Sequence, residues 1–275
     1  MHLKKLNIGI IGLGHWGPNL VRNFATNNRC EIKYVCDLKE SNFSRVENLI
    51  PANCLKTKNA KELIQSSEIN TVVVATSASS HYPLVKMSLI AGKHVFCEKP
   101  LTLDSEQDKE LYELANRLQL KLMVGYTFLF NRAINELKEM VTQNRMGQIY
   151  YLSSTRTHMG LVRDDTSAIW DLAPHDVAIM NYLLESLPER VSAVASSPLG
   201  LKYPDVSFIN LLYPNGIMGQ IHVSWVDSNK ERILRIIGSK ARAVFNDLDG
   251  LEPVRLFEKG IGIGSQDQVN YGEFK

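Results

Sequence analysis

The chain has 275 residues, of which 44% are hydrophobic and 22% charged, and its formal net charge is +2. This composition indicates a soluble globular protein with room for two domains of ordinary size. Lysine and arginine are scattered among the acids, which argues against nucleic acid as the main partner. The sequence has no uncharged apolar run of about 18 residues to cross a membrane and no signal sequence at its start. We therefore expect a cytoplasmic protein with no membrane partner.

The four cysteines are Cys30, Cys36, Cys54 and Cys97, at irregular spacings with no CxxC pair and no Cys/His cluster. This pattern argues against a disulfide framework and against a zinc site. We expect buried thiols in a reducing compartment, and no metal site.

The first half of the chain alternates short apolar runs with helical patterns. The run from Leu6 to Ile11 leads into the glycine turn GLGHWG at residues 12–17, and a helix is expected over residues 18–26. Further strand-like runs and helical patterns follow at residues 32–36, 71–75, 84–91, 94–97 and 105–118. Unbroken runs rich in valine and isoleucine suit parallel strands covered on both faces. The pattern predicts a Rossmann domain, a doubly wound parallel sheet, over residues 1–122.

The second half changes character from Gln148 onward, where the strand-like runs lie closer together and alternate between apolar and polar residues. These runs are residues 149–157, 190–196, 206–213, 217–226, 232–238 and 241–246. YPNG at 213–216 is a strong hairpin signal, and GSK at 238–240 is a second one. We predict an α+β domain over residues 123–275 with a large, mainly antiparallel open sheet. Helices at 131–141 and after His175 should cover its packed face.

The glycine turn has a specific physical use in dinucleotide binding. Gly12 permits the tight turn, Gly14 lets backbone approach a pyrophosphate, and Gly17 lets the following helix pack close to the strand. The helix N-terminus then offers N–H groups and partial positive charge to the phosphates. Such glycine patterns occur in many loops, but this one follows a predicted strand and opens a predicted helix.

Asp37 ends the second predicted strand, where an acid can accept hydrogen bonds from both ribose hydroxyls of adenosine and repels a 2′-phosphate. We therefore predict NAD as the cofactor in preference to NADP. The alternative is that Asp37 is a solvated carboxylate at a strand end. Lys39, two residues later, weakens the argument that a phosphate is excluded.

Several motifs together resemble one enzyme family. After the glycine turn come ATSASSH at 75–81, AGKHVFCEKP at 91–100, GYTFLFNR at 125–132 and WDLAPHD at 170–176. In these motifs the sequence resembles the Gfo/Idh/MocA oxidoreductases, from about residue 6 to at least residue 245. The resemblance implies a Rossmann domain followed by a domain with a large open antiparallel sheet. It also implies a homo-oligomer, a dimer or tetramer, formed through that sheet.

The resemblance implies that Lys99, Asp171 and His175 are catalytic. Oxidation of a secondary alcohol needs a base for the hydroxyl proton while the hydride leaves carbon. His175 suits this role because the reference pKa of histidine is about 6.5, and the Lys99 ammonium could stabilise the developing alkoxide. Pro174 predicts that a helix begins there, with Asp171 before it and Asp176 at its positive end. The alternative is that Asp171 only caps the helix and His175 is a half-exposed residue at its start.

Further site residues follow from position and resemblance. The candidate cofactor ligands, besides the glycines and Asp37, are His15, Trp16, Thr76, Ser77, His81, Glu98, Lys99 and Pro100. The candidate substrate ligands are Tyr126, Asn131, Arg156, His158, Arg163 and Trp170. Helix capping is an equal alternative for His81, and plain solvation is an alternative for the basic residues. Phe128 and Phe130 are expected in the core.

The sequence departs from the family pattern in three places. One is that no acid lies three residues after His175, and Asp176 is adjacent to it instead. Ala173 replaces the glycine of the usual DxGxH motif. The chain also ends soon after Phe257, where family members commonly continue with a further helix, so we expect a C-terminally short second domain. The motif WDLAPHD resembles the branch associated with nucleotide sugars and surface polysaccharides, including oxidation of UDP-N-acetylglucosaminuronic acid. We predict an NAD(P)-dependent oxidoreductase acting on a nucleotide-linked sugar. The alternatives are a catalytically silent NAD-binding regulator or scaffold, and a dehydrogenase of free sugars or inositol.

Overall fold

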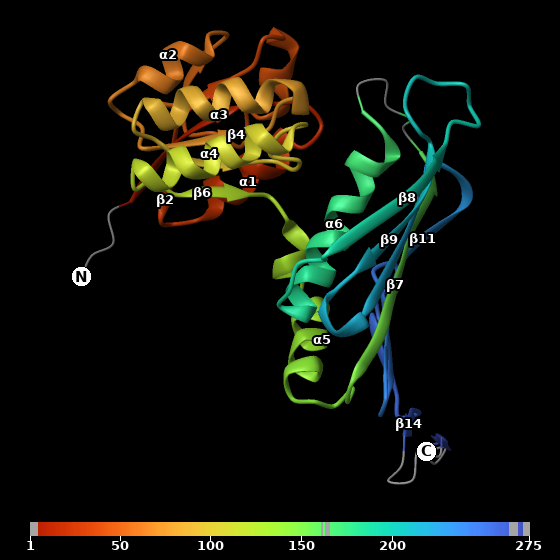
Figure 1. The fold of residues 1–275 in the computed structure, drawn as a ribbon. Helices are drawn as coiled ribbons and strands as arrows, with labels where there is room; N and C mark the ends of the chain where they lie inside the picture. Colours follow the sequence, from red (N-terminus) through yellow and green to blue (C-terminus); the bar gives the residue numbers. More distant parts are fainter. Residues whose placement is uncertain (1–4, 161, 163–165, 264–268, 272–275) are drawn as a thin grey trace. The chain divides into compact units, whose positions relative to one another are not determined.

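The computed structural model describes residues 5–160, 162, 166–263 and 269–271. Its contacts divide the chain into two compact units, residues 1–125 and 126–275. In the first unit, drawn in red to yellow in Figure 1, six parallel strands form a sheet. Their order is β3-β2-β1-β4-β5-β6. The strands are β1 (Leu6–Ile11), β2 (Cys30–Cys36), β3 (Leu55–Thr57), β4 (Thr71–Val74), β5 (His94–Cys97) and β6 (Leu122–Val124).

Helices cover both faces of this sheet. They are α1 (Gly17–Thr26), α2 (Ala60–Gln65), α3 (His81–Ile90) and α4 (Ser105–Arg117), with the 3-10 turns η1 (Glu40–Arg45) and η2 (Ala78–Ser80). Val73 of β4 packs with α1 and η1 in one core, whereas its neighbours Val72 and Val74 pack with α2, α3 and α4 in the other. Because successive side chains of a strand point to opposite faces, the sheet is buried on both. The predicted doubly wound domain is confirmed.

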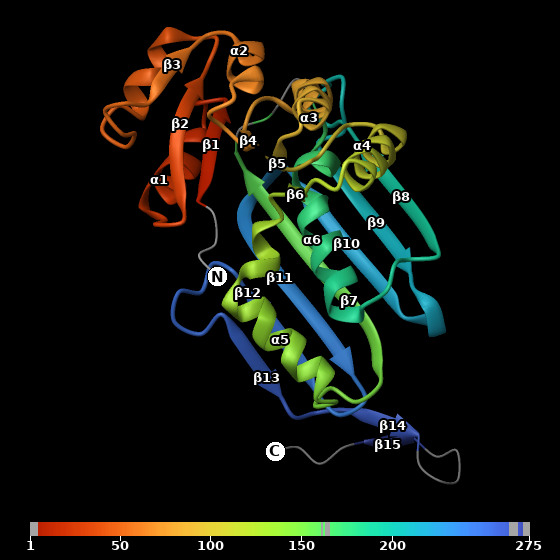
Figure 2. The same ribbon diagram turned by 90° about the vertical axis from the view of Figure 1, so that its left-hand side faces the viewer.

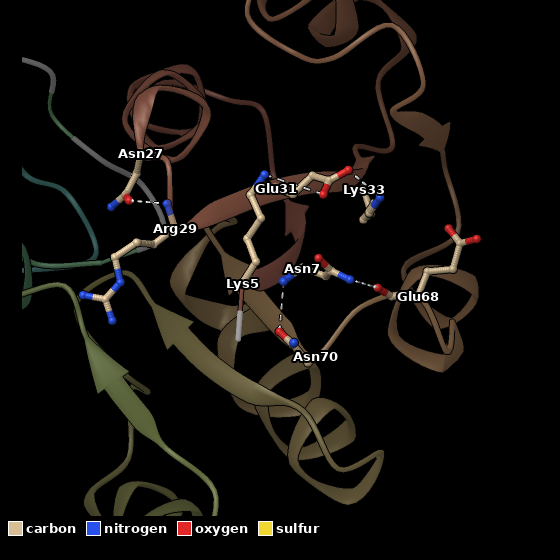
Figure 3. A network of polar contacts seen from close by, with 8 residues as sticks. All are labelled: Lys5, Asn7, Asn27, Arg29, Glu31, Lys33, Glu68 and Asn70. Atoms are coloured by element: carbon tan, nitrogen blue, oxygen red, sulfur yellow. Dashed lines mark hydrogen bonds and ion pairs between the residues drawn. The ribbon is translucent and has the colours of Figure 1, made fainter. Parts of the chain in front are cut away.

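The amino end of β1 is fixed by polar contacts to the neighbouring segments (Figure 3). The Asn7 backbone N–H donates to Asn70 Oδ1 at 3.1 Å, and its side-chain amide donates to the Glu68 carbonyl at 2.9 Å. On β2, Lys33 pairs with Glu31. These contacts lie at the end of the sheet opposite to the glycine turn.

The second unit contains a seven-stranded sheet in the order β13-β12-β11-β7-β10-β9-β8. The strands are β7 (Ile149–Met159), β8 (Arg190–Ser196), β9 (Val206–Leu212), β10 (Met218–Ser224), β11 (Val226–Gly238), β12 (Arg242–Asn246) and β13 (Val254–Phe257). Among the pairs of described strands in this sheet, only β7–β10 is parallel. Both predicted hairpins are present: η4 (Pro214–Gly216) joins β9 to β10, and residues 239–241 join β11 to β12. A two-stranded sheet, β14 (Ile261–Ile263) and β15 (Val269–Tyr271), follows.

One face of the seven-stranded sheet is covered by two helices, α5 (Arg132–Thr142) and α6 (Ala168–Leu184), as Figure 2 shows. Leu137 of α5 and Ile179 of α6 pack against Ile221 of β10 and Leu234 of β11 in a single buried core. The short turn η3 (Thr127–Phe130) precedes α5. The predicted open, mainly antiparallel sheet with one packed face is confirmed.

The predicted start of α6 at Pro174 is wrong. The helix begins at Ala168, and the Ser167 side chain caps it by accepting from the Trp170 N–H at 3.3 Å. Pro174 lies inside the helix, where its missing N–H costs one backbone hydrogen bond. The prediction relied on the proline and overlooked a better indication of the helix start, Ser167 as a capping residue before two apolar residues. Asp171 consequently lies in the first turn and not before the helix.

Two smaller predictions also need correction. Cys54 is only half-buried, whereas Cys30, Cys36 and Cys97 are buried as expected, and all four are free thiols. Phe130 is 70% exposed and not in the core, because η3 turns it outward. Among the helices in the described ranges, none combines the length and the apolar character needed to cross a membrane.

The cap at the start of α6 can be tested directly. Ser167→Ala should lower the free energy of unfolding by about 1 kcal/mol, because the Trp170 N–H loses its acceptor. Urea unfolding monitored by circular dichroism measures this change. An unchanged unfolding free energy would contradict the helix start at Ala168.

Candidate functional site

The glycine turn between β1 and α1 is built by close backbone approach. Gly12 has a φ of 98°, and a Cβ added there would lie 2.5 Å from the Ala75 carbonyl oxygen. A Cβ on Gly17 would lie even closer to the Gly12 carbonyl oxygen. Both positions therefore require glycine, the first for its backbone conformation and both for space.

Gly14 differs from these two glycines. A Cβ added there would have no heavy atom of the described chain within 4 Å. The requirement for glycine is thus not internal packing, and the open side of Gly14 is where a pyrophosphate would approach the backbone. This arrangement fits a dinucleotide cofactor.

Asp37, at the carboxyl end of β2, is joined to the glycine turn. Its Oδ2 accepts from the Leu13 N–H at 2.7 Å, and its Oδ1 accepts from the Lys39 N–H at 2.8 Å. Each carboxylate oxygen keeps a further lone pair for a ribose hydroxyl. The sequence reasoning missed Arg45, whose Nη1 donates to the Gly14 carbonyl at 2.7 Å. Arg45 therefore supports the turn from η1.

Glu98 links the glycine turn to the end of β5. The Trp16 indole N–H and the Lys99 backbone N–H both donate to its carboxylate. Burial raises the pKa of Glu98 above its usual value, and these two hydrogen bonds oppose that shift. Its Oε1 is buried and has no hydrogen-bond partner within the described ranges. Glu98 thus fixes Trp16 near Lys99 and keeps one acceptor for a ligand. His15 in the same turn is exposed.

His81 holds together the two loops that carry other predicted cofactor ligands. It is 1% exposed, with Nδ1 2.7 Å from the Pro100 carbonyl oxygen and Nε2 3.1 Å from the Thr76 carbonyl oxygen. These contacts join the two loops, and the cofactor-binding and helix-capping roles of His81 both stay predictions. Thr76 also accepts from the Ser80 hydroxyl at 2.7 Å, and Ser77 is exposed.

In the second unit, Asp171 and His175 lie four residues apart in α6, so they share one face of the helix. Burial is the largest cause of a lowered pKa of His158 on β7, and the charge of Asp171 opposes that shift. Asp171 is therefore close enough to His158 to act on it electrostatically. The structure brings Asp171, His175 and His158 to the end of the sheet where α6 begins.

Asp176 and Arg156 lie beside this group, and the prediction that Asp176 serves the positive end of the helix is wrong. Asp176 is 2% exposed and accepts from Arg156 Nε at 2.7 Å and Nη2 at 3.1 Å. A solvated role for Arg156 is also excluded, since only 6% of its side chain is exposed. Whether Arg156 also contacts substrate stays a prediction.

The remaining predicted substrate ligands have varied surroundings. Asn131 caps α5, its Oδ1 accepting from the Ala133 N–H at 2.8 Å. Tyr126 is half-buried at the start of η3, and Trp170 is 41% exposed on the first turn of α6. Arg163 lies outside the described residues. Within those residues, no group of three or more His, Cys, Asp or Glu side chains could hold a metal ion.

Comparisons with known families identify both units. Residues 6–126 match the model described as "Oxidoreductase family, NAD-binding Rossmann fold", and residues 134–244 match the GFO/IDH/MocA C-terminal domain. A curated relative, myo-inositol 2-dehydrogenase of Thermotoga maritima, is 26% identical over 88% of this chain and 75% of its own length. Alignments with two further curated relatives span 67% and 59% of those proteins.

Solved structures share the fold. GenD2 from gentamicin A biosynthesis, in complex with NAD, has a TM-score of 0.84 at 19% identity, covering 100% of this chain and 82% of its own. The WlbA dehydrogenase of Bordetella pertussis, in complex with NADH and UDP-GlcNAcA, has a TM-score of 0.81 at 21% identity. That alignment covers 90% of this chain and 75% of WlbA.

The open side of Gly14 gives a prediction for cofactor binding. Gly14→Val should fold normally but bind NAD at least about tenfold more weakly, a loss of about 1.4 kcal/mol, because its side chain fills the phosphate approach. Isothermal titration with NAD measures the affinity. Gly250→Val, at another glycine with open space, is the matched control. Equal NAD affinity in Gly14→Val and wild type would contradict this use of the turn.

The raised pKa of Glu98 gives a pH-dependent prediction. Between its ordinary pKa and its raised folded pKa, the folded state binds more protons than the unfolded one, so stability falls as pH rises through this range. Glu98→Gln removes this titration and keeps an acceptor for Trp16. The Tm of the variant relative to wild type should therefore rise as the pH increases above the ordinary pKa of a glutamate, as differential scanning fluorimetry can measure. A Tm difference independent of pH would refute the buried carboxyl.

Proposed function

Because the chain belongs to the Gfo/Idh/MocA family of oxidoreductases and its first unit is an NAD-binding Rossmann domain, we propose that it is an NAD-dependent dehydrogenase or reductase. Its reaction transfers a hydride between the nicotinamide and a secondary hydroxyl or ketone of a sugar. The observation that carries the proposal is the helical face shared by Asp171 and His175, which adds an acid/base pair to a cofactor-binding fold.

Residues at the carboxyl ends of the strands of the first unit can be assigned to successive parts of the cofactor. Gly14 would face the pyrophosphate, and Asp37 would accept from the adenosine ribose, which favours NAD over NADP. Trp16 and Glu98 would border the nicotinamide, with the free acceptor of Glu98 suited to its amide N–H group. Arg45 would hold the turn in its binding conformation.

Bound NAD would supply the hydride acceptor for oxidation and, in its reduced form, the hydride donor for reduction. The chain's own residues must then handle the proton of the substrate hydroxyl. His175 removes that proton in oxidation and returns it in reduction, and Lys99 donates a hydrogen bond that stabilises negative charge on the oxygen. Asp171, one helical turn before His175, orients the imidazole or accepts from a sugar hydroxyl.

For the substrate we propose a nucleotide-linked sugar used in surface-polysaccharide biosynthesis. Support comes from the motif WDLAPHD and from the fold shared with WlbA, which was solved with UDP-GlcNAcA. Inositol is supported equally, because curated relatives include inositol 2-dehydrogenases. The four free thiols fit our proposal of a reducing, cytoplasmic location.

We further propose a homo-oligomer formed through the uncovered face of the second sheet. Exposed side chains alternate there with the buried ones of the packed face, and include Tyr151, Val194, Phe208 and Met218. The Phe208 ring stacks on His222 with centroids 4.4 Å apart. Exposed apolar side chains gathered on one face of a sheet are typical of a protein interface.

Turnover of candidate substrates tests the catalytic proposal. The purified chain with NAD should reduce the cofactor with one member of a panel of UDP- and dTDP-linked sugars, uronic acids and inositols. Lys99→Met and His175→Gln should each lower kcat by about 100-fold or more, since proton transfer contributes that much. Lys109→Met, at an exposed position of α4, is the control. NAD binding without turnover of any substrate would favour the silent regulator.

Charge on the uncovered sheet face tests the oligomer. The pair Phe208→Glu and Met218→Glu should convert the oligomer to monomers in analytical ultracentrifugation, because like charges would be buried across the interface. Leu251→Glu, at an apolar residue 94% exposed elsewhere, is the control. A monomeric wild-type chain would refute the proposed interface.

A further inference from the structure

A buried ion pair joins β7 to α6 one residue after His175. Asp176 and Arg156 form two hydrogen bonds, at 2.7 and 3.1 Å, and the side chains are 3% and 6% exposed. Asp176 Oδ1 also accepts from the Ser154 hydroxyl at 2.6 Å. Three hydrogen bonds thus fix the carboxylate of a residue adjacent in the helix to His175, and they fix it against the central strand.

Phe128 connects the same arginine to the imidazole itself. The Arg156 guanidinium carbon lies 4.6 Å from the centroid of the Phe128 ring, within the range of a cation–π contact. The Phe128 ring in turn meets the His175 ring edge to face, with centroids 5.1 Å apart and planes at 65°. The contacts therefore run from Arg156 through Phe128 to the side chain of His175.

Two independent routes from Arg156 consequently converge on His175, one through the helix backbone at Asp176 and one through the Phe128 ring. A buried ion pair is a poor device for stability alone, because apolar side chains of similar volume often serve equally well. It does impose geometry, since the guanidinium meets the carboxylate in a fixed plane. A side chain that transfers a proton must be held in a defined orientation, whereas packing of the core does not require an ion pair of fixed geometry.

We propose that Arg156, Asp176 and Phe128 are positioning residues that hold the His175 imidazole in its reactive orientation. This inference rests on the proposed role of His175 in proton transfer. It gives Arg156 a function without substrate contact, and it gives the adjacent acid in the PHD sequence a role distinct from that of Asp171.

The test uses the His175 ring signals in the NMR spectrum of the full chain, which has seven histidines. His175→Gln assigns them by their loss. The double variant Arg156→Met with Asp176→Leu replaces the ion pair by apolar side chains and so preserves the fold, and Phe128→Leu removes the ring. In both variants the His175 ring signals should shift and broaden as the imidazole samples several orientations. Phe128→Tyr keeps an aromatic ring at this position and should leave the His175 signals as in the wild-type chain.

Kinetics adds a second readout once a substrate is known. Both variants should lower kcat by about 10- to 100-fold, the usual effect of a misplaced catalytic group, and leave the Kd for NAD unchanged. The matched control is Arg242→Met, which removes the similar contact of Arg242 with the Phe257 ring at 5.3 Å.

The two readouts separate failure of this inference from failure of the proposed function. A folded double variant with His175 signals in their wild-type positions would overturn the positioning role, whatever the activity. If the signals move as expected but His175→Gln keeps the wild-type kcat on a substrate that the wild-type chain turns over, the positioning stands and the acid/base function of His175 falls.

Discussion

The carboxyl ends of β1, β2, β4 and β5 lie at one edge of the first sheet because all its strands run parallel. This constraint gathers residues far apart in sequence, since each loop that leaves the edge carries part of the site. The Gly12 turn, Asp37, Thr76 and Glu98 follow these four strands in turn. Hydrogen bonds of Asp37 and His81 then join the loops at this end of the sheet to one another.

The second unit uses a different principle. Within the described residues, helices pack against one face of its sheet. The α6 helix that buries this face also presents Asp171 and His175 in its first two turns. The helix carries buried apolar residues on the side that meets the sheet, and Asp176 replaces one of them with a buried charge paired to β7. The same helix therefore buries the apolar face of the sheet and carries the proposed catalytic residues. The position of the His175 imidazole depends on the apolar packing and on the ion pair of Asp176.

Most of the fold follows from the sequence because the long strands and helices carry strong periodic signals. The runs 94–97 and 190–196 match β5 and β8 in both bounds. The short elements β3, α2 and β6 carry too few residues for a period to be visible and were not predicted. Pro174 misled the prediction of α6, since a proline inside a helix imitates one at its start.

The site was predictable where a motif fixes the residue and its role together, as in the glycine turn. Arg45 could not be found in this way, because its contact with the Gly14 carbonyl joins segments with no shared motif. The pairing of Asp176 with Arg156 likewise depends on which strand lies under α6. Arginine is rarely buried without a partner, so the sequence gives no reason to expect a buried Arg156. The pairing with the Asp176 carboxylate explains its burial.

The central claim is that the cofactor binds at the carboxyl ends of the strands of the first unit. Its most direct test is hydrogen exchange of the full chain with and without NAD, measured by mass spectrometry. Binding should slow exchange in the segments around residues 12–18, 37–39, 76–80 and 98–101. Protection confined to the second unit, or no protection at saturating NAD, would contradict the account.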